Sequence, residues 1–179
     1  MRCVVFNQKG GVGKSTIVCN LAAISASRGL RTLVIDLDPQ GNASQYLLGA
    51  DARGAQPNLA TFFESALSYS FREPDFASFI HVTPFENLEI VPSHPDLDAL
   101  QGKLESRYKI YKLRDALKTL DDYDAVYIDT PPELNFFTRS ALIAVECCLI
   151  PFDCDDFSRR ALYSVLENVQ EILTITIRI

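Results

Sequence analysis

Short apolar runs alternate with longer amphipathic segments along almost the whole chain. Apolar runs of about four to six residues are typical of buried parallel strands in a sheet that helices cover on both faces. The expected strands are 3–6, 31–36, 88–91, 125–129 and 147–150. Since helical patterns separate these strands, right-handed crossovers should join them. The pattern predicts an α/β fold with a doubly wound, mostly parallel sheet and helices on both faces.

The helices are expected where apolar residues recur at helical spacing. The first covers 15–28, with Ile17, Leu21 and Ile24 on one stripe and Gly29 placed to end it. Proline and glycine are frequent in 37–58, which predicts a functional loop with a short helix at 44–48. Further helices are expected at 96–104, 110–120, 138–145 and 156–173, with one or two more within 59–79.

A glycine-rich, basic segment follows the first strand directly. Its three glycines let the backbone turn tightly and bring N–H groups close to a phosphate chain, and the next helix adds its positive end. Lys14 is expected to reach the β- and γ-phosphates, and the Ser15 hydroxyl to bind Mg²⁺. A flexible glycine turn is the plain alternative. We predict that a nucleoside triphosphate binds at Lys9, Gly10, Gly11, Val12, Gly13, Lys14, Ser15 and Thr16.

Lys9 is an additional cation in this loop, and Gln8 stands where the strict phosphate-loop pattern has glycine. In these residues the chain resembles the ParA/MinD family of deviant Walker-type ATPases, and Asn7-Gln8 resembles its ParA branch of Soj-like partition ATPases. A second cation near the γ-phosphate stabilises transferred charge, as an arginine finger does with an effect of about 10³–10⁵ in rate. The resemblance implies that Lys9 reaches into the partner's site of a nucleotide-sandwich dimer. By charge alone, Lys9 would be a solvated surface lysine.

Two aspartates one residue apart end the second strand, at the edge where open α/β sheets place ligands. One carboxylate can sit near the metal's water shell while the other orients or deprotonates the attacking water. Residues 36–42 resemble the DxDPQGN motif of the ParA family, which implies that Asp38 acts in hydrolysis and at the metal. A plain Asp-Pro turn is the alternative.

The apolar run 125–128 delivers Asp129 to the same edge, as a Walker B strand does. Asp129 can hold Mg²⁺ or its coordinated water, whereas a helix cap or turn is the structural alternative. The following Thr-Pro-Pro resembles the family's rigid loop near the γ-phosphate. The expected catalytic residues are thus Lys9, Lys14 and Asp38, and the expected metal ligands are Ser15, Asp38 and Asp129.

Composition places the chain among cytoplasmic globular proteins. Its 179 residues suffice for one domain, and 47% hydrophobic with 22% charged residues is typical of a soluble fold. No apolar run approaches the length of a membrane helix. The five cysteines are an odd count without a C-x-x-C pair, which favours reduced core residues over metal ligands. The net charge of −6 argues weakly against a DNA-coating surface.

The resemblance extends from residue 1 to about residue 171, and the ending 173–179 differs from the family. This ending could form a short final strand or be unrelated sequence. The expectation is one ParA-like domain over 1–179, with the C-terminal part of the family fold missing or replaced after about 172. The family's basic DNA-binding positions cannot be carried over. Arg159 and Arg160 could touch nucleic acid or a partner, although a solvated face is the simpler interpretation.

The favoured function is a ParA-like ATPase that uses ATP and Mg²⁺ and forms an ATP-dependent homodimer. The resemblance implies plasmid or chromosome partition, or positioning of another large cargo, with slow hydrolysis until a ParB-like partner stimulates it. Nonspecific DNA binding and a nucleoid-associated location follow from resemblance alone. The alternative is a nucleotide-binding interaction module without turnover. A third reading is a reductase like the nitrogenase iron protein or a dethiobiotin-synthetase-like ligase, but Cys147-Cys148 within a strand does not suit a cluster site.

Overall fold

A computed structural model describes residues 1–68, 74–152, 163, 166, 167, 169 and 170. Most of the helix expected over 156–173, including Arg159 and Arg160, lies outside the described residues. The segment 173–179 lies wholly outside them.

The described residues contain one six-stranded sheet with the order β3-β4-β2-β5-β1-β6. Its parallel strands are β1 (Arg2–Val5), β2 (Thr32–Asp36), β4 (Leu88–Val91), β5 (Ala125–Asp129) and β6 (Cys147–Leu149). The prediction of a mostly parallel, doubly wound sheet is confirmed. The additional strand β3 (His81–Val82) pairs antiparallel with β4 at the edge. Two residues are too few for an alternating pattern, so the sequence did not reveal this strand.

Helices connect the strands at the expected places, with shifted ends. They are α1 (Lys14–Ser27), α2 (Asn42–Leu48), α3 (Leu59–Ser65), α4 (Leu97–Ser106), α5 (Lys112–Leu117) and α6 (Phe136–Ala144). Short 3₁₀ turns are η1 (Gly49–Gly54), η2 (Phe76–Phe79) and η3 (Lys109–Tyr111).

Two of these helices differ from the prediction for local reasons. The helix expected over 110–120 is divided into η3 and α5. Helix α6 begins before residue 138 because the Asn135 side chain accepts hydrogen bonds from Phe137 N (3.0 Å) and Thr138 N (3.1 Å). Such a cap satisfies amides that the first helical turn leaves without partners.

The apolar stripe expected on the first helix is confirmed only in part, because Ile17 and Leu21 are half-buried and pack against the core but do not form the most buried face. Helix α1 buries Val18, Ala22 and Ala26 against the sheet, whereas Ile24 is 48% exposed. The small side chains of Ala22 and Ala26 let the helix approach the strands closely, and Ile17 and Leu21 pack beside this face. Hydrophobicity alone did not distinguish the most buried face of α1 from the neighbouring face that carries Ile17, Leu21 and Ile24.

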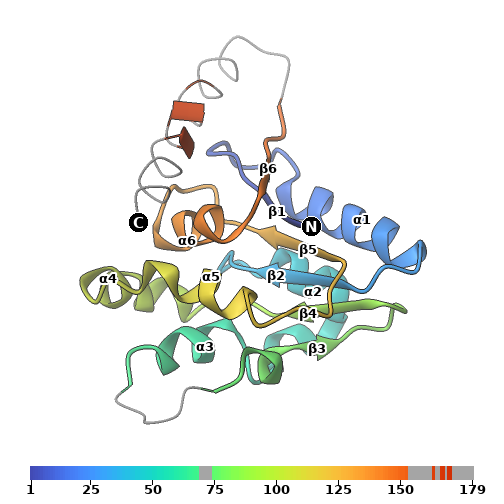
Figure 1. Cartoon of the computed structure of the whole chain (residues 1–179), viewed down its shortest axis with the longest axis horizontal. Helices are drawn as coiled ribbons and strands as arrows, with labels where there is room; N and C mark the ends of the chain where they lie inside the picture. Colours follow the sequence, from blue (N-terminus) through green and yellow to red (C-terminus); the bar gives the residue numbers. More distant parts are fainter. Residues whose placement is uncertain (69–73, 153–162, 164–165, 168, 171–179) are drawn as a thin grey trace.

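The sheet separates two cores, and helices lie on both of its sides (Figure 1). Helices α1 and α2 pack on one face, and α3, α4, α5 and α6 pack on the other. The second core contains edge-to-face phenylalanine pairs, with ring centroids 5.1 Å apart for Phe62–Phe63 and 5.3 Å for Phe63–Phe137. Because β1 lies between β5 and β6, and β5 lies beside β2, the carboxyl ends of β1, β2 and β5 meet at one edge.

Candidate active site

The loop between β1 and α1 turns through two glycines in the left-handed region. Gly11 has φ of 74° and Gly13 has φ of 80°, values that L side chains rarely adopt. Gly13 is the N-cap residue of α1 and provides no side chain, so no side-chain cap covers the first amides of the helix. These N–H groups are therefore available to an anion at the positive end of the helix.

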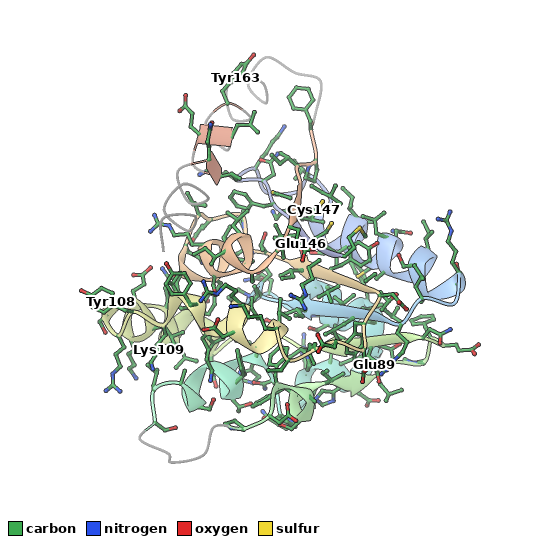
Figure 2. All side chains as sticks on the ribbon, viewed as in Figure 1. Glu89, Tyr108, Lys109, Glu146, Cys147 and Tyr163 are labelled. Atoms are coloured by element: carbon green, nitrogen blue, oxygen red, sulfur yellow. The ribbon has the colours of Figure 1, made fainter. Side chains whose placement is uncertain are left out.

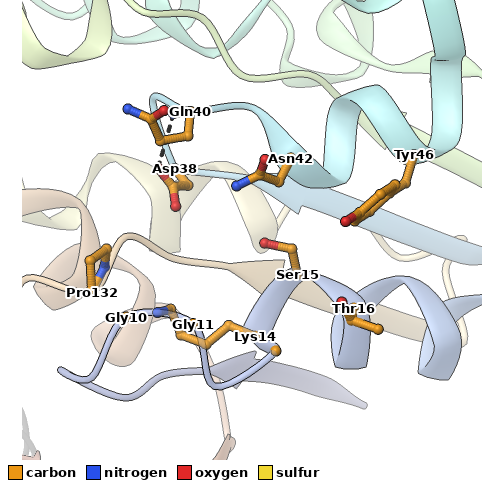
Figure 3. A pocket seen from close by; sticks show the side chains of 11 residues that line it. Gly10, Gly11, Lys14, Ser15, Thr16, Asp38, Gln40, Asn42, Tyr46 and Pro132 are labelled. Carbon is orange, nitrogen blue, oxygen red and sulfur yellow. Dashed lines mark hydrogen bonds between the residues drawn. The ribbon is translucent and has the colours of Figure 1, made fainter.

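A cleft of about 410 Å³ opens beside this loop. In Figure 3, the loop and the start of α1 form one wall, and the segment after β2 forms the opposite wall. Six residues of the predicted 9–16 segment line the cleft, and Lys9 and Val12 do not. The lining residues are Gly10, Gly11, Gly13, Lys14, Ser15, Thr16, Asp38, Gln40, Asn42, Tyr46 and Pro132.

The start of the loop is held by a buried amide. Asn7 Oδ1 accepts a hydrogen bond from Lys9 N at 2.9 Å, and Asn7 Nδ2 donates to Pro151 O at 2.6 Å. Lys9 itself is exposed, at the entrance of the loop. Its expected action on a partner subunit therefore stays a prediction.

Buried carboxylates gather beneath the cleft. Asp36 and Asp129 are register partners at the ends of β2 and β5, and both are fully buried. Asp38 is 7% exposed and lines the cleft. Asp129 Oδ1 accepts from Thr130 N at 3.1 Å, but Asp129 Oδ2 is buried with no hydrogen-bond partner among the described residues. A buried carboxylate oxygen without a partner is a natural place for a cation or its bound water.

These oxygen donors fit Mg²⁺. The Ser15 hydroxyl, Asp38 and Asp129 are hard ligands of the type that this ion prefers, and Mg²⁺ usually binds through one or two carboxylates together with phosphates and water. Within the described residues, no group of three or more His, Cys, Asp or Glu side chains could hold a metal by itself. The donor set therefore suits a metal that phosphate groups help to hold.

The electrostatics of the site also favour an added cation. Burial raises the pKa of Asp36 to about 8, and the charge of Asp129 adds to this effect. Burial likewise raises the pKa of Asp129 to about 6, although the Ser15 hydroxyl and the Lys14 ammonium lower it. The pKa of Lys14 is lowered by burial although Asp129 and Asp38 favour its charge. Since Lys14 faces a surplus of carboxylates, a divalent cation would relieve their repulsion.

Asp36 supports the segment that carries Asp38. Its Oδ2 accepts from Ser44 Oγ (2.7 Å) and Ser44 N (2.8 Å), and its Oδ1 accepts from Asp38 N (3.2 Å). Ser93 N donates to Ser44 Oγ at 3.0 Å, and Ser93 Oγ donates to Asp38 O. Asp38 Oδ1 accepts from Gln40 N at 3.0 Å. The network fixes the backbone on both sides of Asp38.

Sequence reasoning did not assign three of the lining residues, Gln40, Asn42 and Tyr46, to the site, whereas Pro132 belongs to the Thr-Pro-Pro segment that the resemblance placed near the γ-phosphate. Asn42 and Tyr46 lie one turn apart on α2 and face the Ser15 and Thr16 wall (Figure 3). Asn42 belongs to the motif after β2, so its position there could have identified it. The same holds for Gln40. Tyr46 is 62% exposed and has no sequence signal of its own.

Comparison with known proteins identifies the family of this chain. Residues 2–178 match the family described as AAA domain (AAA_31). The chain is 37% identical to the chromosome partitioning protein ParA of Myxococcus xanthus over 168 residues, which is 92% of this chain and 56% of that protein. It is 34% identical to the chromosome-partitioning ATPase Soj of Treponema pallidum, across 94% of this chain and 63% of Soj. The chain thus spans less than two thirds of these relatives' length.

Solved structures show the same fold. A cobyrinic acid a,c-diamide synthase from Mycobacterium smegmatis, with a bound ATP analog and magnesium, superposes with a TM-score of 0.86 and 30% identity. The match covers 98% of this chain and 69% of the synthase. A plasmid partition protein from Borrelia burgdorferi gives a TM-score of 0.79 and 26% identity, over 96% of this chain and 72% of that protein. Within the described residues, none of the helices has the length and apolar character needed to span a bilayer.

Proposed function

This chain belongs to the AAA domain family, and from that premise we propose that it is a ParA-like ATPase that binds Mg²⁺ and ATP in the cleft beside α1. The observation that carries the proposal is the convergence of three features on one cleft. These are the uncapped start of α1, the buried Lys14, and the carboxylates at the ends of β2 and β5.

Each group has a role in this proposal that follows from its position. The amides of 10–16 and the Lys14 ammonium bind the phosphate chain. Ser15 and Asp129 hold Mg²⁺ or its water, which supplies charge neutralisation on the phosphates. Asp38, on the opposite wall of the cleft, orients the attacking water and accepts its proton. The hydrogen bonds on both sides of Asp38 keep its carboxylate on that wall.

The proposal includes an ATP-dependent sandwich dimer in which Lys9 reaches the partner's phosphates. The exposed position of Lys9 at the loop entrance supports this role, because Lys9 does not line the cleft of its own subunit. Turnover would then be slow until dimerisation and a ParB-like partner complete the site. The names of the relatives support plasmid or chromosome partition as the process, and the proposal places it in the cytoplasm.

Three variants test the proposal when their ATP binding, ATP hydrolysis and size with ATP are compared with the unchanged chain. Lys14→Ala should lose ATP affinity by about 100-fold, since a charged phosphate contact contributes about 3 kcal/mol. Asp38→Ala should bind ATP without turnover, and Lys9→Ala should bind ATP with impaired dimerisation and turnover. Lys118→Ala on the distant α5 side is the control. A chain that stays monomeric at saturating ATP would overturn the dimer, and unchanged hydrolysis in Asp38→Ala would overturn the assigned base.

Two other outcomes correspond to other functions. ATP binding without hydrolysis in any condition would favour a nucleotide-binding interaction module. The similarity to the diamide synthase favours a second candidate, an ATP-dependent synthase that forms an amide from a small carboxylic acid. ATP turnover that requires such an acid and a nitrogen donor would identify that function.

A further inference from the structure

Tyr46 is the one aromatic residue among those that line the nucleotide cleft in the described part of the chain. The other lining residues are glycines, one proline, and polar or charged side chains. The Tyr46 side chain is 62% exposed, whereas Tyr127 on β5 is 5% exposed and belongs to the core. An aromatic ring that is exposed in a cleft offers a ligand an apolar surface that the core has not used.

Folding does not account for the position of the Tyr46 side chain. Helix α2 packs on the sheet through Ala43 and Leu47, and Tyr46 lies on the side of the helix that faces the cleft (Figure 3). Among the residues that the structure describes, the Tyr46 hydroxyl has no hydrogen-bond partner and the ring has no aromatic or cationic partner. The buried Tyr127 hydroxyl, by contrast, shares a hydrogen bond of 2.9 Å with Ser25 Oγ. The Tyr46 side chain is therefore available to a ligand.

The position of Tyr46 along the cleft indicates which part of a nucleotide it would contact. Figure 3 shows Asp38 and Pro132 near Gly10 at one end of the cleft. Tyr46 lies across from Thr16 at the other end. In the proposed function, the γ-phosphate and the attacking water lie at the Asp38 end, and the loop amides hold the phosphates toward the start of α1. Because the ribose and base follow the α-phosphate, they leave the loop at the end where Tyr46 lies.

We propose that the Tyr46 ring packs against the ribose and base of the bound nucleotide, and that it contributes affinity for the nucleoside and none for the phosphates. This inference rests on the proposed function and deepens it by assigning a residue to the nucleoside. Stacking of a base on an aromatic ring is strong enough for loss of the ring to lower affinity about tenfold. Since every base has a π-face, Tyr46 would not discriminate between adenine and guanine.

The test titrates the full chain, in the presence of Mg²⁺, with ATP, with ADP and with inorganic tripolyphosphate. Tyr46→Ala should lower the affinity for ATP and ADP about tenfold and leave the affinity for tripolyphosphate unchanged, because tripolyphosphate has no nucleoside. Tyr46→Phe keeps the ring and should retain the affinity for all three probes. Lys14→Ala should weaken ATP and tripolyphosphate alike, since its ammonium contacts the phosphates in the proposed site.

Tyr108 provides the matched control. It is 89% exposed, and Figure 2 shows it at the left edge of the molecule, close to the end of α4. Helix α4 packs on the face of the sheet opposite to α1 and α2, which flank the cleft. Tyr108→Ala should therefore leave the affinity for all three probes unchanged. Because both variants remove an exposed ring, neither should lower the melting temperature appreciably.

A second measurement uses the fact that the sequence contains no tryptophan. Tyr46→Trp gives the protein a single indole fluorophore in the cleft. ATP and ADP should change its emission, because a base stacks on the indole, whereas tripolyphosphate should not. Tyr108→Trp places the fluorophore outside the cleft, so its emission should respond to none of the three probes.

The proposal is overturned if Tyr46→Ala binds ATP as tightly as the unchanged chain. It is also overturned if this variant loses affinity for ATP and tripolyphosphate equally, since the ring would then act on the phosphate loop. Failure of the proposed function gives a different result, because the unchanged chain would then bind neither ATP nor tripolyphosphate. That result would overturn both proposals, whereas the first two results leave nucleotide binding intact.

Discussion

Asp36 and Asp129 lie directly opposite each other at the ends of β2 and β5, and both carboxyl groups are fully buried. Besides burial, the charge of Asp129 raises the pKa of Asp36, and the charge of Asp38 raises the pKa of Asp129. The carboxylates at these strand ends therefore repel one another when no cation is bound. Ser44 offsets part of this repulsion through two hydrogen bonds to Asp36. The pair therefore connects folding stability to proton and metal binding.

The stability of the metal-free protein should fall as pH rises. The pKa values of Asp36 and Asp129 are about 8 and about 6 in the folded chain, both above the ordinary value of 3.8. The folded state therefore retains protons that the unfolded state has lost, and this stabilisation disappears between about pH 4 and about pH 8. Thermal unfolding at about pH 5 and about pH 8 measures the effect. Asp36→Asn should flatten the profile, and a profile identical to the unchanged chain would contradict the assignment.

Magnesium should reverse this trend. Because the cation competes with the protons of these carboxyl groups, its stabilising effect should grow over the same pH range. Thermal unfolding with saturating Mg²⁺ and ADP, at each pH, provides the comparison. A magnesium effect that weakens with rising pH would place the ion away from Asp129.

Two glycines of the phosphate loop should respond differently to alanine. Gly13→Ala places a Cβ at φ of 80°, which should destabilise the protein by about 1–2 kcal/mol. Gly10 lacks a positive φ, and a Cβ there meets no atom within 4 Å, so Gly10→Ala should leave stability unchanged. The added methyl would nevertheless enter the cleft, and nucleotide affinity should fall. Chemical denaturation and nucleotide titration separate the two effects, and normal affinity in Gly10→Ala would show that the phosphates lie elsewhere.

Ser44→Ala should weaken the support of Asp38. The change removes a buried hydroxyl that donates to Asp36 Oδ2 and accepts from Ser93 N, at a cost of about 1–3 kcal/mol. Urea unfolding measures this cost, and Ser27→Ala, at an exposed hydroxyl on α1, should cost almost nothing. A loss of ATP turnover larger than the loss of ATP affinity is expected, since the proposed role of Asp38 is to act on the attacking water. Equal effects of the two variants would contradict the role of the network.

Phe63→Ala should destabilise the face of the sheet that holds α3 and α6. Phe63 is fully buried, and its ring packs edge-to-face on Phe62, Phe136 and Phe137. The expected loss is about 3–5 kcal/mol in a denaturant titration. Phe85 is 53% exposed, so Phe85→Ala should cost much less. Similar losses for both variants would mean that the aromatic cluster contributes little.

The sequence was sufficient for the sheet and for the phosphate loop because both have strong local signals. Buried parallel strands give uninterrupted apolar runs, and the glycine–lysine pattern needs no tertiary information. The features that the sequence did not predict depend on tertiary contacts. The buried stripe of α1 depends on how closely Val18 and Ala22 can approach the strands, which hydrophobicity does not report.

The support of Asp38 was likewise hidden from sequence reasoning. Ser44 and Ser93 are separated by 49 residues, and neither belongs to a pattern that marks a site. Only their shared contact with the Asp36 segment gives them a role. Tyr46 presents the same difficulty, because an exposed tyrosine on a short helix carries no indication of the cleft beneath it.

The hydrogen bond from Asn7 to Pro151 connects the phosphate loop to the segment that follows β6. The Asn7 carboxamide donates to a residue 144 positions away in the sequence and also accepts from the Lys9 amide. It therefore joins the start of the glycine-rich loop to the segment after β6. Any displacement of Pro151 must either break that 2.6 Å contact or pull on the Lys9 amide. A shift of Pro151 would thereby be transmitted to the entrance of the nucleotide cleft.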